Sequence, residues 1–144
     1  MAELRYVIPL DPRTKKNHQM IAGTGKRCPV CKKHERQFIR QGQAHDEYAE
    51  RAVWHLRPRP PRPIDCEINI KCMFYMQTRR RVDSLNLLAA VDDLLVEAGI
   101  IADDNSKIVV SHDGSRVLYD KDNPRTEITI TRVPGVQQMK LPLE

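Results

Sequence analysis

Residues 66–76 read CEINIKCMFYM, and residues 83–98 read DSLNLLAAVDDLLVEA. In the first stretch, apolar residues alternate with polar ones such as Glu67, Asn69 and Lys71. This alternation predicts a β-strand with one buried face, because successive side chains of a strand point to opposite sides. The apolar set is Cys66, Ile68, Ile70, Cys72 and Phe74.

The second stretch predicts an amphipathic helix from Asp83 to Ala98, because its apolar residues recur every three or four positions. Asp83 or Ser84 can cap the start, and Gly99 ends the helix. The apolar arc holds Leu87, Leu88, Val91, Leu94, Leu95 and Ala98. The opposite arc holds Asp83, Asn86, Asp93 and Glu97, with Ala90 among them.

Together with the flanking segments, these two elements predict one α+β domain over residues 1–144, with two main helices packed against a small mixed sheet. We expect residues 134–144 to form a loose tail. The other expected elements are a strand (4–10), a polar loop (13–25), a compact turn (28–35), a helix (43–56), an extended Pro-rich linker (57–63), a hairpin of strands 107–110 and 115–119 around Asp113-Gly114, and a closing strand (127–133).

The charge distribution is compatible with a polyanionic partner. The chain carries a net charge of +5, with a pI of about 9.2. Basic clusters precede a stretch rich in acids from Asp83 to Asp104. The aromatic content of 5% argues against recognition by base stacking. There is no long apolar segment and no signal-peptide pattern, so we expect a cytoplasmic protein with reduced cysteines and no membrane partner.

The acids suggest a chemistry. Phosphodiester cleavage uses carboxylates that hold a divalent metal. Asp83 begins the predicted helix, whereas Asp103 and Asp104 follow its end, roughly 24 Å away at 1.5 Å per residue. They can therefore share one site only if the loop folds back along the helix or if two chains pair antiparallel. The alternative interpretation is that Asp83 is a helix cap and that the Asp pair is a solvated turn.

The segment from Arg79 to Asp104 resembles the RusA-type Holliday junction resolvases of bacteria and their phages. The resemblance covers roughly Ile68 to Arg132, and the upstream stretch PRTKKN (12–17) is similar to the family's Asn-containing loop. Its motifs are Arg79-Arg80-Arg81-Val82-Asp83-Ser84-Leu85-Asn86, then Asp93, Ala98-Gly99 and Asp103-Asp104.

This resemblance implies a Mg²⁺-dependent crossover junction endodeoxyribonuclease of recombination and repair, acting as a homodimer that nicks four-way junctions symmetrically. It implies that Asp83 and Asp104 bind the metal, supported by Asn86 and Asp103 as further catalytic residues. It also implies that DNA is bound by Lys15, Lys16, Asn17, Arg79, Arg80 and Arg81.

Two positions depart from the family pattern. The best-known members carry a second Asp where this chain has Leu85, and a Lys where it has Ala89. Asp93 or Glu97 is a candidate replacement for the acid, and Lys15 or Lys16 for the base. Because of these departures, a structure-selective DNA-binding protein with weak or lost nuclease activity stays open as the alternative.

Residues 26–35 form a basic loop with the spacing of a zinc knuckle, Cys28, Cys31 and His34. His18, His45 or a second chain could supply the missing ligand. The alternative is a surface turn with two free thiols, and a small zinc-stabilised basic protein is a third functional interpretation. We expect Cys66 and Cys72 to be core residues.

Three further features have competing interpretations. We interpret Trp54 as core or dimer packing rather than as a base-stacking platform. Residues 57–62 are either a DNA-facing arm or a solvated linker. His112, beside Asp113, is interpreted as a hairpin residue rather than as a general base.

Overall fold

The computed structural model describes residues 3–14, 19–22, 38–41 and 43–134; for residues 19–22, 38–41 and 43–45 it describes the backbone alone. Several predictions from the sequence lie outside these ranges: the DNA-binding residues Lys15, Lys16 and Asn17, the zinc-knuckle residues Cys28, Cys31 and His34, and the tail beyond Pro134. That residues 1–144 form a single domain stays a prediction.

The sheet is organised around β4 (Ile68–Met76), the alternating strand predicted from the sequence. On one side β4 pairs antiparallel with β7 (Arg125–Arg132), which in turn pairs antiparallel with β1 (Leu4–Ile8). On its other side β4 pairs in parallel with β5 (Val109–Ser111) and β6 (Arg116–Tyr119). The sheet is therefore mixed, and the predicted α+β architecture is confirmed.

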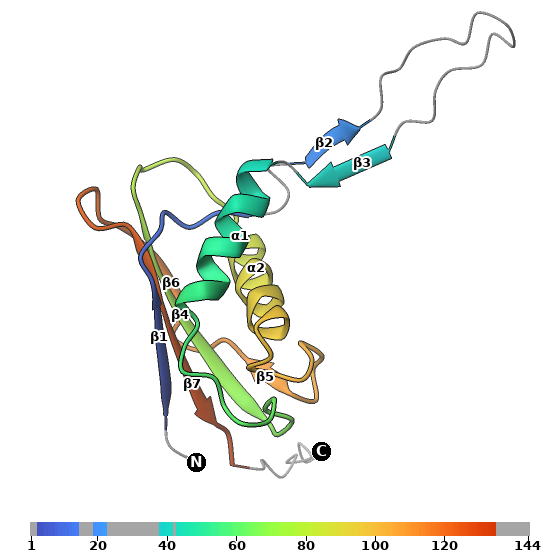
Figure 1. Cartoon of the computed structure of the whole chain (residues 1–144). Coiled ribbons are helices and arrows are strands. Elements are labelled where there is room, and N and C mark those ends of the chain that lie inside the picture. Colours follow the sequence, from blue (N-terminus) through green and yellow to red (C-terminus); the bar gives the residue numbers. More distant parts are fainter. Residues whose placement is uncertain (1–2, 15–18, 23–37, 42, 135–144) are drawn as a thin grey trace, which may run out of the picture.

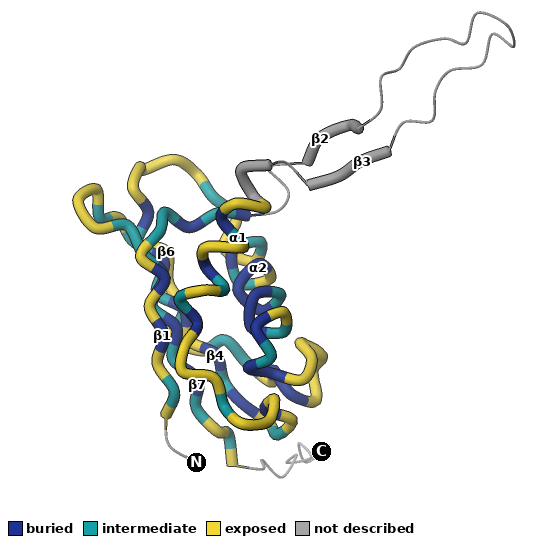
Figure 2. The backbone as a smooth tube through the Cα atoms, in the orientation of Figure 1, coloured by how far each residue is buried: buried dark blue, intermediate teal, exposed yellow. Residues whose placement is uncertain are grey.

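Both helices, α1 (Gln43–His55) and α2 (Ser84–Glu97), lie on the same face of this sheet, as Figure 1 shows. The buried side chains lie between the helices and the sheet, while the outer surfaces are exposed (Figure 2). The fully buried residues of the sheet and α2 are dominated by aliphatic and aromatic side chains: Ile8, Ile68, Ile70, Phe74, Met76, Leu87, Leu95, Ile128 and Ile130.

Burial differs from the sequence-based expectation at four residues. Ala90 and Asp92 are buried, so α2 is covered over a wider arc than its apolar stripe predicts. Cys72 is buried as expected, but Cys66 is only partly buried because it precedes β4. The interpretation of Trp54 as a core residue is wrong, since 62% of it is exposed on the outer side of α1.

The predicted hairpin between residues 107–110 and 115–119 is also wrong, because β5 and β6 each pair with β4 instead of with each other. Asn69 holds the turn between them. Its side-chain oxygen accepts the N–H of Asp113 at 2.7 Å, and its amide nitrogen donates to the Asp113 carbonyl at 3.3 Å. Gly114 has φ +86°, which lets the chain kink outward and return to the same edge. The Asp-Gly turn thus interrupts one edge strand but does not reverse the direction of the chain.

A second, two-stranded sheet has one strand within the segment predicted as a polar loop and the other strand beyond the predicted turn. Strand β2 (Gln19–Ala22) pairs antiparallel with β3 (Phe38–Gln41). The loop prediction for residues 13–25 is therefore wrong for Gln19–Ala22. Their pairing partner is sixteen or more residues away along the chain, so nothing local in the sequence indicates it.

Residues 57–63 form neither helix nor strand, as their proline content predicts. Nevertheless they are tied to the fold: the Tyr6 hydroxyl donates to the Pro58 carbonyl at 2.8 Å, across 52 residues of sequence. Within the described ranges, no helix is long and apolar enough to span a membrane.

Candidate active site at the two ends of helix α2

The first end of α2 begins at Asp83, which has extended backbone geometry and caps the helix. Its Oδ1 atom accepts the N–H of Leu85 at 2.9 Å and that of Asn86 at 3.4 Å. This is the ordinary geometry of an aspartate N-cap, which satisfies helix donors that have no partner within the helix. Both hydrogen bonds use one carboxylate oxygen, and the side chain is exposed to solvent.

A basic turn, Arg79–Arg81, precedes Asp83, and all three arginines are exposed. The Arg79 guanidinium stacks 4.2 Å over the ring of Tyr119 in β6. Arg80 Nη2 lies 3.8 Å from Asp11 Oδ2. The other oxygen of Asp11 accepts the backbone N–H of Gln77 at 2.9 Å. The turn is therefore anchored on both sides, which limits the entropy that its cations lose on contacting phosphate.

The second end of α2 stops at Gly99, whose φ of +74° suits glycine. Ile100 and Ile101, which follow, are buried, and Ile101 forms a parallel bridge with Ile64. These contacts turn the chain away from the helix axis and leave Asp103 and Asp104 exposed. The Asp-Asp pair is thus positioned by its buried neighbours as well as by the hydrogen bonds of the Asp103 side chain.

Hydrogen bonds and charge repulsion shift the pKa values of the two carboxyls of this pair in opposite directions. Asp103 accepts the Asn105 side-chain N–H at 2.9 Å and the backbone N–H of Asp104 at 2.8 Å. These bonds lower the pKa of Asp103. Desolvation raises the pKa of Asp104, and so do its neighbours Asp103 and Asp93. Asp103 and Asp104, with Asp93 acting on Asp104 from α2, therefore form an acidic region at this end of the helix.

Such a group has oxygen donors of the kind that Mg²⁺ prefers. However, no set of three or more His, Cys, Asp or Glu side chains in the described parts of the chain is arranged to hold a metal ion. Asp83 precedes Asp93 by ten residues, about 15 Å along the helix axis. One protomer therefore brings Asp103 and Asp104 together with Asp93 but leaves Asp83 and Asn86 at the far end of α2, as the course of the helix in Figure 1 shows.

The two departures from the family pattern both lie on the exposed side of the first end. Leu85 is 72% exposed, and Ala89, one helical turn later, is exposed as well. A carboxylate and an amine at these positions would face the same solvent as Asp83. Among the described residues, this end then has Asp83 and the Arg80-paired Asp11 next to three arginines.

An Asp92–His112 pair was not predicted. His112 Nε2 lies 2.9 and 3.1 Å from the two carboxylate oxygens of Asp92, and both side chains are largely buried. The pair connects α2 to the segment between β5 and β6, so the interpretation of His112 as a hairpin residue is wrong. Hydrogen bonding to Asp92 raises the pKa of His112 against the lowering effect of burial. The signal in the sequence was the position of Asp92 at the boundary of the apolar arc, because a buried carboxylate needs a partner.

The chain is similar to a known nuclease family. A family model described as Endodeoxyribonuclease RusA matches residues 9–131. This range includes Asp11, the basic turn, all of α2 and the Asp103–Asp104 pair. No curated protein matched the chain.

Proposed function

Since the chain belongs to the RusA endodeoxyribonuclease family, we propose that it is a Mg²⁺-dependent homodimeric nuclease that resolves four-way DNA junctions by paired nicks in recombination and repair. The family implies action on branched DNA, and its nucleases generally depend on a divalent metal. The observation that carries the proposal is the match over residues 9–131, which contains both acidic ends of α2 and the basic turn. We expect the protein to act in the cytoplasm.

A dimer accounts for the separation of the acids. A second copy whose α2 runs antiparallel would bring its own Asp104 beside Asp83 of the first, and the two-fold axis would generate a second identical site. Asp83 and Asp104 would then hold the metal, with Asp103 and Asn86 supporting them. A Mg²⁺ ion bound by such carboxylates supplies charge neutralisation at the phosphate and a more acidic water.

The remaining side chains have roles that follow from their contacts. Asp103 accepts the N–H of Asp104 and so fixes the backbone that presents this carboxylate. Arg79 and Arg81 extend from an anchored turn and would bind backbone phosphates. Arg80 is already paired with Asp11 at 3.8 Å, so it would contribute less. Lys15, Lys16 and Asn17 remain proposed DNA contacts.

The test is cleavage of a synthetic four-way junction. The purified protein should nick it with Mg²⁺ and stop when the metal is chelated. Asp104→Asn should reduce nicking by at least about 100-fold while leaving junction binding intact. Asp122→Asn, on the exposed turn between β6 and β7, is the matched control and should cut normally. Cleavage that survives in both Asp83→Asn and Asp104→Asn would refute the assigned site.

The missing second acid has a structural candidate. Asp93 is one of the carboxylates that raise the pKa of Asp104. We therefore propose Asp93 as the replacement. If Asp93→Asn retains full Mg²⁺-dependent cleavage, Asp93 has no such role.

A second candidate function is a structure-selective DNA-binding protein without nuclease activity. The exposed Leu85 and Ala89 favour it, because they stand where the family pattern has an acid and a lysine. Tight junction binding without nicking in Mg²⁺ or Mn²⁺ would support this function. Leu85→Asp would then be informative: a gain of nicking would show that only the missing carboxylate separates this chain from an active nuclease.

Zinc binding by Cys28, Cys31 and His34 also remains a proposal. Metal analysis of the purified protein should find close to one zinc per chain, or one per dimer if two chains share it. Removal of that zinc by a chelator should lower the thermal midpoint of unfolding, and Cys28→Ser should lower it equally. Protein that is free of zinc and equally stable would exclude this site.

A further inference from the structure

The outer side of α1 carries a large exposed aromatic residue, Trp54. The opposite side of the helix is buried through Tyr48 and Ala52, so α1 does not need Trp54 for its packing against the sheet. Tryptophan is enriched at contact surfaces, because its ring combines a large apolar area with a polar N–H group. Trp54 is also the only tryptophan in the chain.

Trp54 borders a hollow of about 410 Å³ that is lined by Leu10, Glu50, Arg51, Trp54 and His55. The rings of Trp54 and His55 meet edge to face, with centroids 5.0 Å apart and an interplanar angle of 88°. This contact holds the indole in place. The volume lies in the range of small-molecule sites and suffices for one planar heterocycle.

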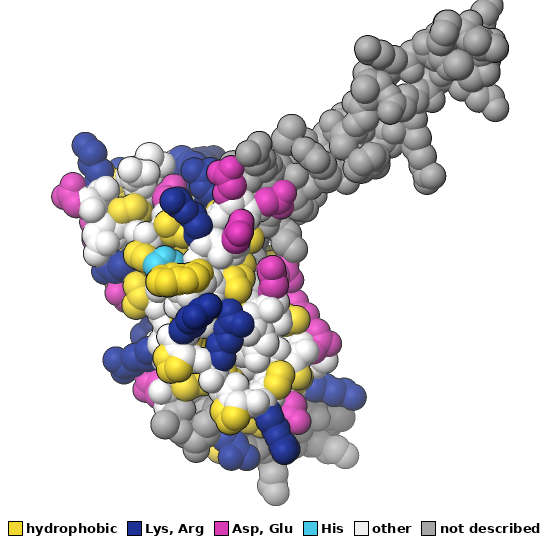
Figure 3. All heavy atoms as spheres, viewed as in Figure 1, with side chains coloured by type: hydrophobic (Ala, Val, Ile, Leu, Met, Phe, Trp, Pro, Cys, Tyr) yellow, Lys and Arg dark blue, Asp and Glu magenta, His cyan; other side chains and the backbone are white. Residues whose placement is uncertain are grey.

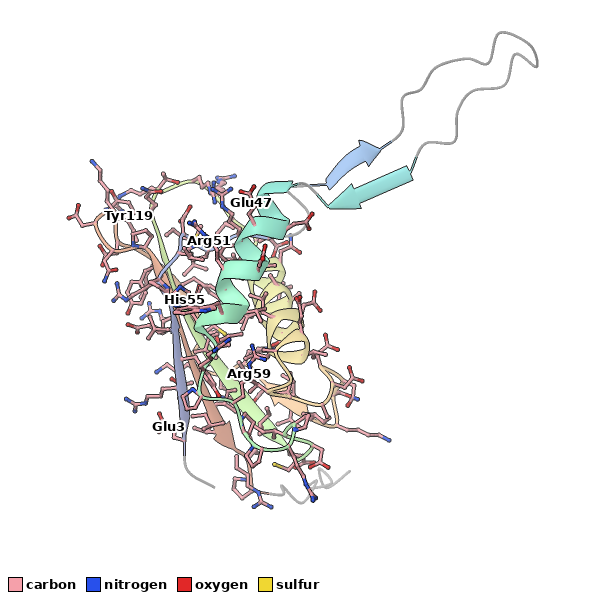
Figure 4. The ribbon with its side chains drawn as sticks, viewed as in Figure 1. Glu3, Glu47, Arg51, His55, Arg59 and Tyr119 are labelled. Carbon is pink, nitrogen blue, oxygen red and sulfur yellow. The ribbon has the colours of Figure 1, made fainter. Side chains whose placement is uncertain are left out.

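One acid, Glu50, lines the hollow together with Arg51, and two further arginines lie near Trp54 or the end of α1. The Arg57 guanidinium lies 5.8 Å from the Trp54 ring centroid. Arg59 donates weakly to the carbonyls of Leu56 and Val53 at 3.4 Å, which keeps its charge close to the end of α1. Figure 4 shows Arg51 and His55 on the same side of α1, with Arg59 beyond its end. Figure 3 shows hydrophobic and histidine side chains over α1, with Lys and Arg side chains above and below them.

A second hollow continues the first towards the proposed active site. It has a volume of about 210 Å³ and shares Leu10 and Arg51 with the first hollow. Its lining also includes Asp11, Arg13, Glu47 and Tyr48, and Asp11 pairs with Arg80 of the basic turn. A strand of nucleic acid held at the basic turn could therefore follow this surface to Trp54.

The charges decide between two occupants of the hollow. In a symmetric dimer formed through this face, the same patch would meet itself, and its arginines would outnumber Glu50, the acid in the lining that could pair with them. Juxtaposed like charges disfavour such a contact. A polyanion with planar bases instead matches both the cations and the ring.

We propose that the Trp54 hollow binds one unpaired nucleobase of branched DNA, stacked on the indole, with its phosphates held by Arg51 and Arg57. The branched context rests on the proposed function, whereas the stacking itself does not require cleavage. The low aromatic content of the chain had argued against stacking, but a single exposed tryptophan is enough for one base.

The test uses the intrinsic fluorescence of the only tryptophan. It is recorded in the Asp104→Asn protein, so that DNA is bound without being cut. Titration with oligothymidylate, and with a junction that carries unpaired thymines at its centre, should quench the emission. Trp54→Ala should bind both DNAs roughly tenfold more weakly, and Trp54→Phe should recover most of this loss. Val7→Ala, an exposed apolar residue on β1, is the control and should bind normally.

Absence of quenching together with unchanged affinity in Trp54→Ala would overturn the inference. A change in sedimentation mass in Trp54→Ala without a change in DNA affinity would also overturn it, since a second copy would then occupy the hollow. Quenching by oligothymidylate in a wild-type protein that never nicks junctions would support the stacking site while refuting the proposed nuclease. Nicking of junctions without quenching would refute the stacking site while supporting the proposed nuclease.

Discussion

The two ends of α2 place aspartates in opposite electrostatic surroundings. At the first end Asp83 follows three exposed arginines and uses one oxygen to cap the helix. At the second end Asp103 and Asp104 lie beside Asp93, and repulsion between these acids contributes to the raised pKa of Asp104. One end therefore suits a phosphate backbone, and the other suits a cation.

The core keeps these ends apart. α2 is packed against the sheet through Leu87 near its start and Leu95 near its end, both buried. A helix held in this way keeps its length, so within one chain the carboxylates at its two ends stay apart. The difference between the ends leads to the proposal that a nuclease site in this protein depends on the assembly of two chains, and the experiments below test that proposal.

The largest expected effect is the recovery of nicking when two inactive variants are combined. In a mixed dimer of Asp83→Asn and Asp104→Asn, sites shared between chains would leave one site intact and the other doubly substituted. An equal mixture that exchanges subunits should then recover about a quarter of the wild-type rate. Cleavage of a four-way junction measures it, with differently tagged chains to prove that mixed dimers form. Mixed dimers without any nicking would place both acids of a site in one chain.

A large effect on stability is expected at one leucine of α2 and almost none at another. Leu95 is fully buried, so Leu95→Ala should lower the free energy of unfolding by about 2–5 kcal/mol. Leu85 is 72% exposed, and Leu85→Ala should change the free energy of unfolding by less than about 0.5 kcal/mol. Urea unfolding measures both. A similar loss at the two positions would contradict the burial of α2 described above.

A smaller effect is expected from the Asp92–His112 pair, which joins the middle of α2 to the sheet edge. Pairing with Asp92 raises the pKa of His112 in the folded protein. The resulting stabilisation is therefore fully present below the ordinary histidine pKa of about 6.5 and is lost as pH rises through the raised value. The stability difference between wild type and His112→Gln, from urea unfolding, should be about 1–3 kcal/mol at low pH and should shrink above neutrality. A difference that grows with pH would contradict this assignment.

The smallest effect separates capping from catalysis at Asp83. Asn accepts the same backbone N–H groups, so Asp83→Asn should leave stability nearly unchanged while it abolishes nicking. Asp83→Ala should lose the cap as well, at about 1 kcal/mol. Thermal or urea unfolding measures the stability of each variant. If Asp83→Asn cuts normally, Asp83 is a helix cap and nothing more.

The sequence alone determined the elements whose signal is local. The alternation in residues 66–76 places Ile68, Ile70 and Phe74 on one face of β4 because side chains of a strand alternate, whatever lies beside it. The period of α2, with Asp83 before it and Gly99 after it, fixes that helix in the same way. The motifs from Arg79 to Asp104 were sufficient to indicate the family that the comparison then confirmed.

Only the tertiary structure decided features that depend on residues distant in the sequence. The Asp113-Gly114 turn favours a hairpin locally, but hydrogen bonds from Asn69 and pairing with β4 give a kinked parallel edge. Asp92 pairs with His112, which lies twenty residues away along the chain. Trp54 is exposed because Tyr48 and Ala52 already fill the space under α1. Both the sequence and the tertiary structure determine the separation of Asp83 from Asp104: helix length predicts it, and the packing of α2 makes it rigid.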